Sequence, residues 1–284
     1  MASRQTVLRN YYNVMKTFIC SKSEKLSKFL LSAYDGGLSF GALNKLLRKK
    51  DIKINGKRVS ADLQLMPGDV VDVYFDGAFT PEVDSIYCDD NVLVVNKPKG
   101  ITSDSFYLML KKGFPQLLYC HRLDRNTDGV MIFALNEIAY SCIVEGFKAR
   151  TFEKFYTAEV YGRVKNDKEV LSAYLLKDQS RSLVEIFDRP TKGAKEIKTA
   201  YRVIDRKDET TILEVELLTG RTHQIRAHLG HIGHFIVGDG KYGREAINRR
   251  LGVKEMKLSS SKLILHFPSS SPLFYLDNKC FCLR

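Results

Sequence analysis

The first part of the chain has a pattern that predicts two amphipathic helices. Apolar residues recur at helical spacing between Leu26 and Ala33. A second helix is predicted farther on, where Leu43 and Leu47 lie on one apolar face and Ser39 fits the N-cap position. A first strand, residues 17–20, is expected before both helices.

A tight β-hairpin is predicted after the second helix. Ile52 and Ile54 alternate with polar residues, and Asn55-Gly56 is a strong signal for a two-residue hairpin turn. Pro67-Gly68-Asp69 predicts another turn, and VVDVYF, residues 70–75, predicts a closing strand. The pattern therefore predicts a small helix–helix–hairpin domain over residues 1–78.

Strand patterns dominate residues 85–284, beyond a linker predicted at residues 79–84. A hairpin is predicted around Asp89-Asp90-Asn91, VMIFAL (residues 130–135) predicts a buried strand, and Asn136 is placed to cap a helix. Further strands are predicted by the segments FEKFYTAEVYG, KTAYRVI, TILEVELL and KLILHF. Because strands and helices do not alternate as a parallel sheet requires, we predict an α+β domain with a mostly antiparallel mixed sheet.

Composition indicates a class of partner only through charge. The 284 residues are 44% hydrophobic, which is enough for a folded core, and carry a net charge of +12. A soluble chain this basic usually meets a polyanion or an anionic membrane. No apolar stretch is long enough to span a membrane, so an RNA partner is favoured and no membrane is expected.

The cysteines and the N-terminus bear on the compartment. The six cysteines are scattered or too close for a CxxC pair, and no secretory signal precedes them, so a reduced, cytoplasmic location is expected. The first 23 residues lack any acid and carry Arg4, Arg9 and Lys16. An organellar transit peptide would fit this composition; a basic tail that runs into the first strand is the preferred interpretation.

Positive charge is concentrated in the second predicted helix and the hairpin. Fourteen residues contain seven cations against the single acid Asp51. A charge run is commonly just a solvated surface, but a compact group around a tight turn also suits phosphate contacts. The candidate RNA-binding residues here are Lys45, Arg48, Lys49, Lys50, Lys53, Lys57 and Arg58.

One carboxylate in the second domain has an unusual setting. Asp124 lies between Arg122 and Arg125, just ahead of the buried strand. Nearby arginines favour the ionised form of an aspartate, which can then act as a nucleophile or a base. A structural role in a turn or an ion pair explains the same residues, and this segment alone leaves both open.

Three further segments carry candidate chemistry. In VVNKPKG, residues 94–100, a strand ends in Lys97; in EKFYTAEVYG, residues 153–162, Tyr156 lies on a strand. The segment LLTGRTHQIRAHLGHIGHFIVGD, residues 217–239, predicts a helix capped by Thr222, with His223 and Arg226 on one face. Each residue alone has an ordinary structural explanation.

Together these segments resemble a known enzyme family. The stretch HRLDRNTDG, which we call the signature loop, and TGRTHQIRAHL with the following GD are similar to motifs of the RluA-type pseudouridine synthases over residues 85–267. The segment EKLSKFLLSAYDGGLSFGALNKLLRKKDIKINGKRV and the later GDVV resemble an S4-like RNA-binding domain over residues 16–76. An S4-like domain followed by a pseudouridine synthase domain is the organisation that the resemblance implies.

The resemblance also implies site residues. Asp124 matches the catalytic aspartate, Tyr156 the tyrosine that packs against the target base, and Arg226 the arginine paired with the aspartate. Arg122 matches an arginine associated with holding the RNA open, and Lys97 matches a motif lysine near the site, which we include among the RNA-binding residues.

The implied reaction converts a uridine in RNA to pseudouridine. The carboxylate attacks the sugar or removes its 2′ proton, and the sequence does not choose between these. The target must be flipped out of folded RNA, which costs a few kcal/mol. No step needs a metal, nucleotide or redox cofactor. Large-subunit ribosomal RNA is the favoured substrate, and a monomer is expected.

Two rival interpretations remain. His228, His231 and His234 have a spacing of three, which spreads their side chains over a wide arc of a helix, so no metal site is expected. The basic N-terminal domain would equally suit a non-catalytic ribosome-associated RNA-binding factor. The presence of Asp124, Tyr156 and Arg226 within their motifs favours the enzyme.

Overall fold

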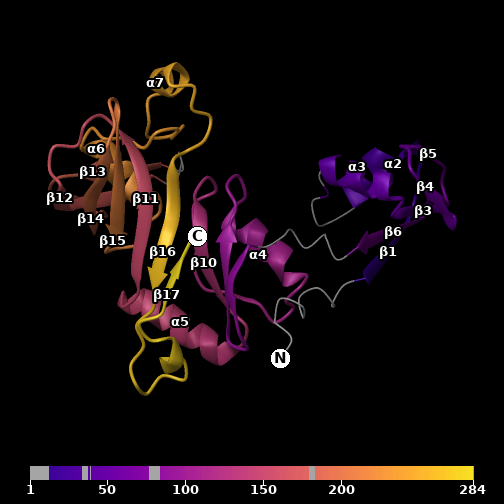
Figure 1. Ribbon diagram of the computed structural model, residues 1–284, viewed down its shortest axis with the longest axis horizontal. Coiled ribbons are helices and arrows are strands. Elements are labelled where there is room, and N and C mark those ends of the chain that lie inside the picture. Colours follow the sequence, from indigo (N-terminus) through magenta and orange to yellow (C-terminus); the bar gives the residue numbers. More distant parts are fainter. Residues whose placement is uncertain (1–12, 34–37, 39, 77–83, 179–182, 284) are drawn as a thin grey trace. The chain divides into compact units, whose positions relative to one another are not determined.

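A computed structural model describes residues 13–33, 38, 40–76, 84–178 and 183–283 of the chain. The chain divides into two compact units, Met1–Glu82 and Val83–Arg284. Most of the expected linker, residues 79–84, lies outside the described residues. Figure 1 labels most of the helices and strands of each unit.

The smaller unit is a four-stranded antiparallel sheet with two helices. Its sheet order is β1-β6-β3-β4, and β2 and β5 form a separate short pair. The elements are β1 (Asn13–Ile19), β2 (Glu24–Lys25), α2 (Leu26–Ala33), α3 (Phe40–Lys49), β3 (Ile52–Ile54), β4 (Lys57–Val59), β5 (Gln64–Leu65) and β6 (Val70–Asp76).

The predicted helices and hairpin of this unit are present. Leu26, Leu43 and Ile52 are completely buried in one core between the helices and the sheet. Asn55 and Gly56 both have positive φ, 50° and 80°, as the two-residue hairpin turn requires. The first strand begins at Asn13, earlier than predicted, and the predicted cap Ser39 lies outside the described residues, as do Arg4 and Arg9.

The larger unit is built on one 11-stranded sheet. Its main path has the order β13-β12-β14-β15-β11-β16-β10-β8-β7, with β9 paired to β10 and β17 to β16. The strands are β7 (Ser85–Cys88), β8 (Val92–Lys97), β9 (Leu118–Tyr119), β10 (Asp128–Ala134), β11 (Glu153–Tyr161), β12 (Lys168–Asp178), β13 (Leu183–Phe187), β14 (Lys195–Arg206), β15 (Thr210–Leu217), β16 (Leu258–Ile264) and β17 (Cys280–Cys282).

The mostly antiparallel α+β architecture confirms the predicted fold class. Among the described strands, only β10 and β16 pair in parallel. The helices of this unit are α4 (Ser103–Lys111), α5 (Glu137–Ala149), α6 (Gln224–His231), α7 (Glu245–Arg250) and the 3-10 helix η1 (Phe274–Leu276). Asn136 caps α5 as predicted, accepting a hydrogen bond from the N–H of Ala139. No described helix is both long and apolar enough to cross a membrane.

Two hydrophobic cores lie on opposite faces of the sheet, which explains the continuous apolar run of β10. Met131 and Phe133 enter one core, with residues of α4 and α6, whereas Val130 and Ile132 enter the other, with residues of α5. Successive side chains of a strand point to opposite faces of the sheet. In a strand that is covered on both faces, every position is therefore buried and apolar residues follow one another without alternation. The sheet is therefore a rigid base for the loop that precedes β10.

Some elements of the larger unit were not predicted from the pattern. These include α4, α7, the short strand β9, β12 and the edge strand β13. The expectation that Thr222 caps α6 is wrong: His223 occupies the N-cap position with a left-handed φ of 56° and makes no side-chain capping bond. The helix ends at His231.

Candidate active site

The signature loop, residues 121–129, is held from both sides of Asp124. On one side Leu123 is buried in the core, and its N–H and C=O form hydrogen bonds of 2.9 and 2.8 Å with the hydroxyl of Ser103 on α4. On the other side Gly129 has a φ of 117°, and a Cβ there would lie 2.2 Å from the carbonyl oxygen of Ser260. The close approach of β16 therefore requires glycine at this position.

Arg226 joins two carboxylates that are far apart in the sequence. Its Nη1 donates to Oδ2 of Asp124 at 3.0 Å, and its Nε and Nη2 donate to the two oxygens of Asp239 at 2.7 and 2.8 Å. Ile225, the preceding residue on α6, is buried in the same core as Leu123. Asp124 and Arg226 are thus each positioned by a neighbouring apolar residue, Leu123 and Ile225, and both of these apolar residues lie in one core.

The charges in this group support one another. Burial acts against the charged form of Arg226, but the hydrogen bonds and charges of Asp239 and Asp124 raise its pKa above its ordinary value. Burial likewise acts to raise the pKa of Asp239, and the bonds and charge of Arg226 outweigh it and lower that pKa. Asp239 is 1% exposed, so it supplies a fixed negative charge that orients the guanidinium toward Asp124.

His223 and Tyr242 complete this side of the site. Nε2 of His223 lies 3.9 Å from Oδ2 of Asp124, and its Nδ1 lies 2.9 Å from the hydroxyl of Tyr242. Burial lowers the pKa of His223, and the charge of Asp124 opposes this. Sequence reasoning did not select Asp239 or Tyr242, although the GD that contains Asp239 was part of the recognised motif, and it gave His223 a place on the same helix face as Arg226 but no role.

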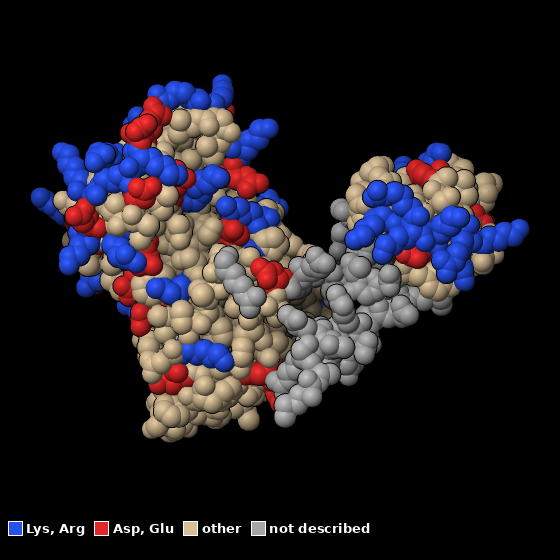
Figure 2. Space-filling view, viewed as in Figure 1, with Lys and Arg blue, Asp and Glu red and all other residues tan. Residues whose placement is uncertain are grey.

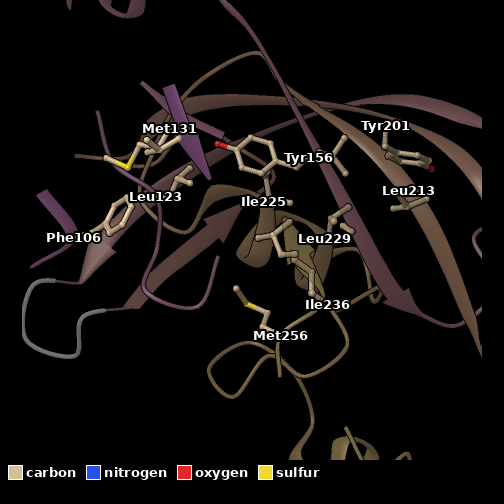
Figure 3. Close-up of a cluster of buried hydrophobic side chains, with 14 of the residues drawn as sticks. Phe106, Leu123, Met131, Tyr156, Tyr201, Leu213, Ile225, Leu229, Ile236 and Met256 are labelled. Carbon is tan, nitrogen blue, oxygen red and sulfur yellow. The ribbon is translucent and has the colours of Figure 1, made fainter. Parts of the chain in front are cut away.

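Tyr156 lies in the apolar floor beside Asp124. Figure 3 shows its ring in the cluster with Leu123 and Ile225 next to it. The residue is 8% exposed, and burial together with the charge of Asp124 raises the pKa of its hydroxyl. Tyr156 is therefore a neutral aromatic surface at pH 7.

Lys97 has a different position from the one expected for an RNA-binding residue. It is completely buried, and its ammonium donates to the carbonyl oxygens of Pro98, Ile101 and Arg125 at 2.8, 2.9 and 3.4 Å. Burial lowers its pKa to about 8, and the charges of Asp128 and Asp124 oppose this. Lys97 has no surface for an RNA contact, and it instead ties the end of β8 to the signature loop.

Replacing Lys97 by Met is expected to impair turnover without weakening RNA binding. The three carbonyl groups would lose their common donor, so the signature loop would lose its side-chain tie to β8 and keep only backbone contacts, such as the pairing of Gly129 with residue 97. We expect turnover to fall by roughly tenfold or more and the Kd for RNA to stay within about twofold. Single-turnover kinetics and filter binding measure the two quantities, and a matching rise in Kd would show that Lys97 contacts RNA after all.

A cavity of about 550 Å³ opens over Asp124. Tyr156, His223 and Arg226 line it, and so does Arg122, which is exposed. The structure therefore brings Asp124, Tyr156, Arg226 and Arg122 together around one space, whereas the buried Lys97 does not line it. The cavity combines one carboxylate, aromatic rings that include Tyr156, and several cations, which suits a flipped nucleotide.

Comparison with known proteins decides the family. Residues 91–231 match the family model of RNA pseudouridylate synthase. Ribosomal large subunit pseudouridine synthase C of Vibrio vulnificus is 31% identical over 249 residues, which cover 78% of this chain and 76% of that protein. An uncharacterized RNA pseudouridine synthase of Aquifex aeolicus is 33% identical, covering 81% of this chain and 80% of that one.

The chain belongs to the RluA-type pseudouridine synthase family. The dual-specificity RNA pseudouridine synthase RluA of Vibrio vulnificus is 34% identical and covers 70% of this chain and 84% of that protein. Among solved structures, human RNA pseudouridylate synthase domain containing 1 matches with a TM-score of 0.58 and 28% identity, over 65% of this chain and 78% of that one. The protein is thus an isomerase that acts on RNA.

The smaller unit of this pseudouridine synthase carries the predicted basic group on its surface. Figure 2 shows Lys and Arg side chains gathered on the face in view. All seven cations lie on α3, the hairpin or the turn between them, and all except the partly buried Lys53 are exposed. Lys53 and Arg58 pair across the hairpin, and both lie over the ring of Tyr74. The group therefore includes an aromatic ring as well as charge.

The three histidines of the synthase that recur at a spacing of three, His228, His231 and His234, have separate partners. Nδ1 of His228 lies 3.0 Å from the hydroxyl of Thr199, His231 faces Asp188, and His234 faces the carbonyl oxygen of Tyr161. Among the described residues, no group of three His, Cys, Asp or Glu side chains is arranged to hold a metal ion. The histidines are accounted for by protein contacts.

Proposed function

We propose that this synthase converts uridines of large-subunit ribosomal RNA to pseudouridine, with Asp124 as the reacting carboxylate. The observation that carries the proposal is the bond between Arg226 and Asp124 at the wall of a cavity that Tyr156 also lines. The names of the relatives of this chain, ribosomal large subunit pseudouridine synthase C among them, favour ribosomal RNA as the substrate. Action as a monomer in the cytoplasm is part of the proposal.

The geometry suits the steps of the reaction. The N1–C1′ bond of uridine breaks, the base turns, and a C5–C1′ bond forms, after which the hydrogen on C5 is lost and N1 gains one. Asp124 starts the sequence either by attacking C1′ or by removing the 2′ proton. Arg226 donates a hydrogen bond to the carboxylate and fixes its direction.

The other residues hold the substrate in this proposal. The ring of Tyr156 stacks on the detached uracil, an interaction of about 1–3 kcal/mol per base in comparable sites. Arg122, exposed at the cavity, contacts the RNA from which the uridine has been flipped. Both interactions form only after the uridine has left the RNA helix.

Mapping pseudouridines in cells tests the proposal. In RNA from cells that lack this protein, specific large-subunit sites should read as unmodified uridine, and wild-type protein should restore them. Complementation with Asp124→Asn should leave them unmodified. If both proteins restored the sites, or if no site depended on either, the protein would be a non-catalytic RNA-binding factor.

Replacing Tyr156 by Ala should reduce turnover far more than RNA binding. Its ring contacts one flipped base, whereas affinity comes mainly from phosphate contacts. We expect turnover to fall by roughly a hundredfold or more and the Kd to change by less than about fivefold. Rapid-quench turnover and equilibrium binding provide the comparison, with Tyr275→Ala at an exposed position as a control. Equal losses in both quantities would mark Tyr156 as an ordinary core residue.

We further propose that the smaller unit is an S4-like domain that binds RNA through its basic group. Replacing Lys57 and Arg58, both exposed at the tip of the hairpin, by Gln should weaken binding at low salt. For each phosphate that the variant no longer neutralises, the slope of log affinity against log salt should become shallower by roughly 0.7–0.9. Affinity across a salt series measures this slope, and an unchanged slope would mean that the hairpin is only a solvated surface.

A further inference from the structure

The cavity over Asp124 reaches a second group of side chains, where α5 ends and β11 begins. This group lines the same cavity but includes none of the residues assigned so far. Its members, which we call the α5–β11 subsite, are His121, Phe147, Lys148, Arg150 and Lys154.

The backbone fixes the positions of the two central cations. Arg150 ends α5 in the left-handed conformation, with a φ of 61°, and its N–H donates to the carbonyl oxygens of Gly146 and Phe147. Lys154 is the second residue of β11, two residues before Tyr156. Residues two apart on a strand share a face and are about 7 Å apart along it, which is comparable with the length of one nucleotide.

In the part of the chain that the structure describes, the cations of this subsite form no close ion pair. Among the described residues, no carboxylate lies within ion-pair distance of Lys148, Arg150 or Lys154. Burial and the charge of Arg150 lower the pKa of Lys154, and Glu216 only partly opposes this. Of the described residues that line the cavity, Asp124 is the one acid, and it is already bonded to Arg226. An anion bound here would relieve the repulsion between the cations.

His121 adds a neutral donor to this positive surface. The N–H of Ile132 donates to its Nε2 at 3.0 Å, so the hydrogen of the neutral ring lies on Nδ1. Burial and the charge of Lys154 lower its pKa to about 3, which keeps the ring neutral at pH 7. The ring is stacked on Phe147, 4.5 Å away, and the described residues provide no acceptor for the Nδ1–H. A fixed N–H beside two cations matches the oxygens of a phosphate.

We propose that the α5–β11 subsite binds the backbone phosphate of a nucleotide next to the flipped uridine. This inference rests on the proposed function, because it assumes that the flipped uridine lies over Asp124. Holding the neighbouring phosphate about one nucleotide from Tyr156 would set the register of the strand, so that only one ribose reaches the carboxylate. The subsite thus positions the substrate and takes no part in the bond changes.

Single-phosphate substitution in the RNA tests the subsite. Short RNAs containing a mapped target uridine are made with one uncharged methylphosphonate at each position flanking the target. Binding is measured in the Asp124→Asn background, with and without the double change Arg150→Asn and Lys154→Gln. Asparagine is chosen because it tolerates the left-handed conformation. Circular dichroism verifies folding, and each single change is measured if the double variant does not fold.

One methylphosphonate position should weaken binding by about tenfold. The double change should weaken binding of unmodified RNA by a similar factor and cause no further loss at that position. The control change Arg189→Gln with Lys192→Gln, on exposed residues outside the cavity, should leave the methylphosphonate effect intact. The proposal would be overturned if the losses caused by the methylphosphonate and by the double change multiplied at every position. It would also be overturned if a methylphosphonate weakened binding at no position.

The failure of this inference can be separated from failure of the proposed function. Wild-type protein and unmodified RNA are assayed for pseudouridine in parallel. If pseudouridine forms but the effects of the methylphosphonate and the double change multiply, the subsite alone is wrong. If no pseudouridine forms, the proposed function itself is wrong and the subsite falls with it.

Discussion

Changing Asp124 to Asn should abolish pseudouridine formation while leaving the fold intact. The amide is neutral, so it can neither attack C1′ nor remove the 2′ proton at a useful rate. We expect a loss of roughly a thousandfold or more in turnover. Arg226 would keep its two bonds to Asp239, so the site should not collapse. Pseudouridine yield from RNA under single-turnover conditions measures the effect.

A matched control for this change exists on the same unit. Asp208 is exposed in the turn between β14 and β15, so Asp208→Asn makes the same chemical change away from the cavity. It should leave turnover within about twofold. A folded Asp124→Asn variant that works as well as Asp208→Asn would contradict the assignment of the reacting carboxylate.

Replacing Arg226 by Met should reduce both activity and stability. The change leaves Asp239, whose side chain has no exposed surface, without its cation. Breaking a buried pair in this way typically costs about 3–5 kcal/mol. Turnover should fall by roughly a hundredfold or more, because Asp124 loses the donor that directs it. Denaturant unfolding and turnover assays measure the two losses.

The pH dependence of this stability loss has a definite sign. In the wild type, Arg226 lowers the pKa of Asp239 from 3.8. The pair therefore stabilises the fold above that pH, and the contribution is lost as the pH falls through the lowered value. In the variant, the pKa of Asp239 should rise instead. The difference between the two proteins should therefore shrink toward acid pH, because a protonated Asp239 needs no cation.

A second change separates stability from activity in this pair. Adding Asp239→Asn to Arg226→Met removes the stranded charge but keeps an acceptor for the N–H groups of Lys241 and Tyr242. Stability should recover in large part, whereas turnover should not. Recovery of both would show that Arg226 serves the fold alone.

The reacting group could be predicted from the sequence because long motifs carry it. Asp124, Tyr156 and Arg226 each lie in a longer motif. Neighbouring motif residues, such as Leu123 and Ile225, are buried and stabilise the core. The hairpin at Asn55-Gly56 and the doubly buried strand β10 were likewise predictable, since local turn chemistry and apolar runs determine them.

The remaining features depend on long-range packing that no local pattern shows. Lys97 is the last residue of a strand, where a lysine normally reaches solvent, but the loop that covers it comes from residues about 28 positions later. Asp239 becomes a partner of Arg226 only because the chain turns back after α6. The cap at His223 was missed because its left-handed backbone, and not its side chain, begins the helix.

Release of tritium from RNA labelled at C5 of uridine tests the central claim most directly, because the C5–C1′ bond cannot form unless the hydrogen on C5 leaves. Purified wild-type protein and Asp124→Asn are compared on the same labelled large-subunit RNA fragment, at equal and saturating concentrations. Wild-type protein should release tritium to water in proportion to the pseudouridine formed, and Asp124→Asn should release none above background. Equal release by the two proteins, or no release by the wild type, would contradict isomerisation of uridine through Asp124.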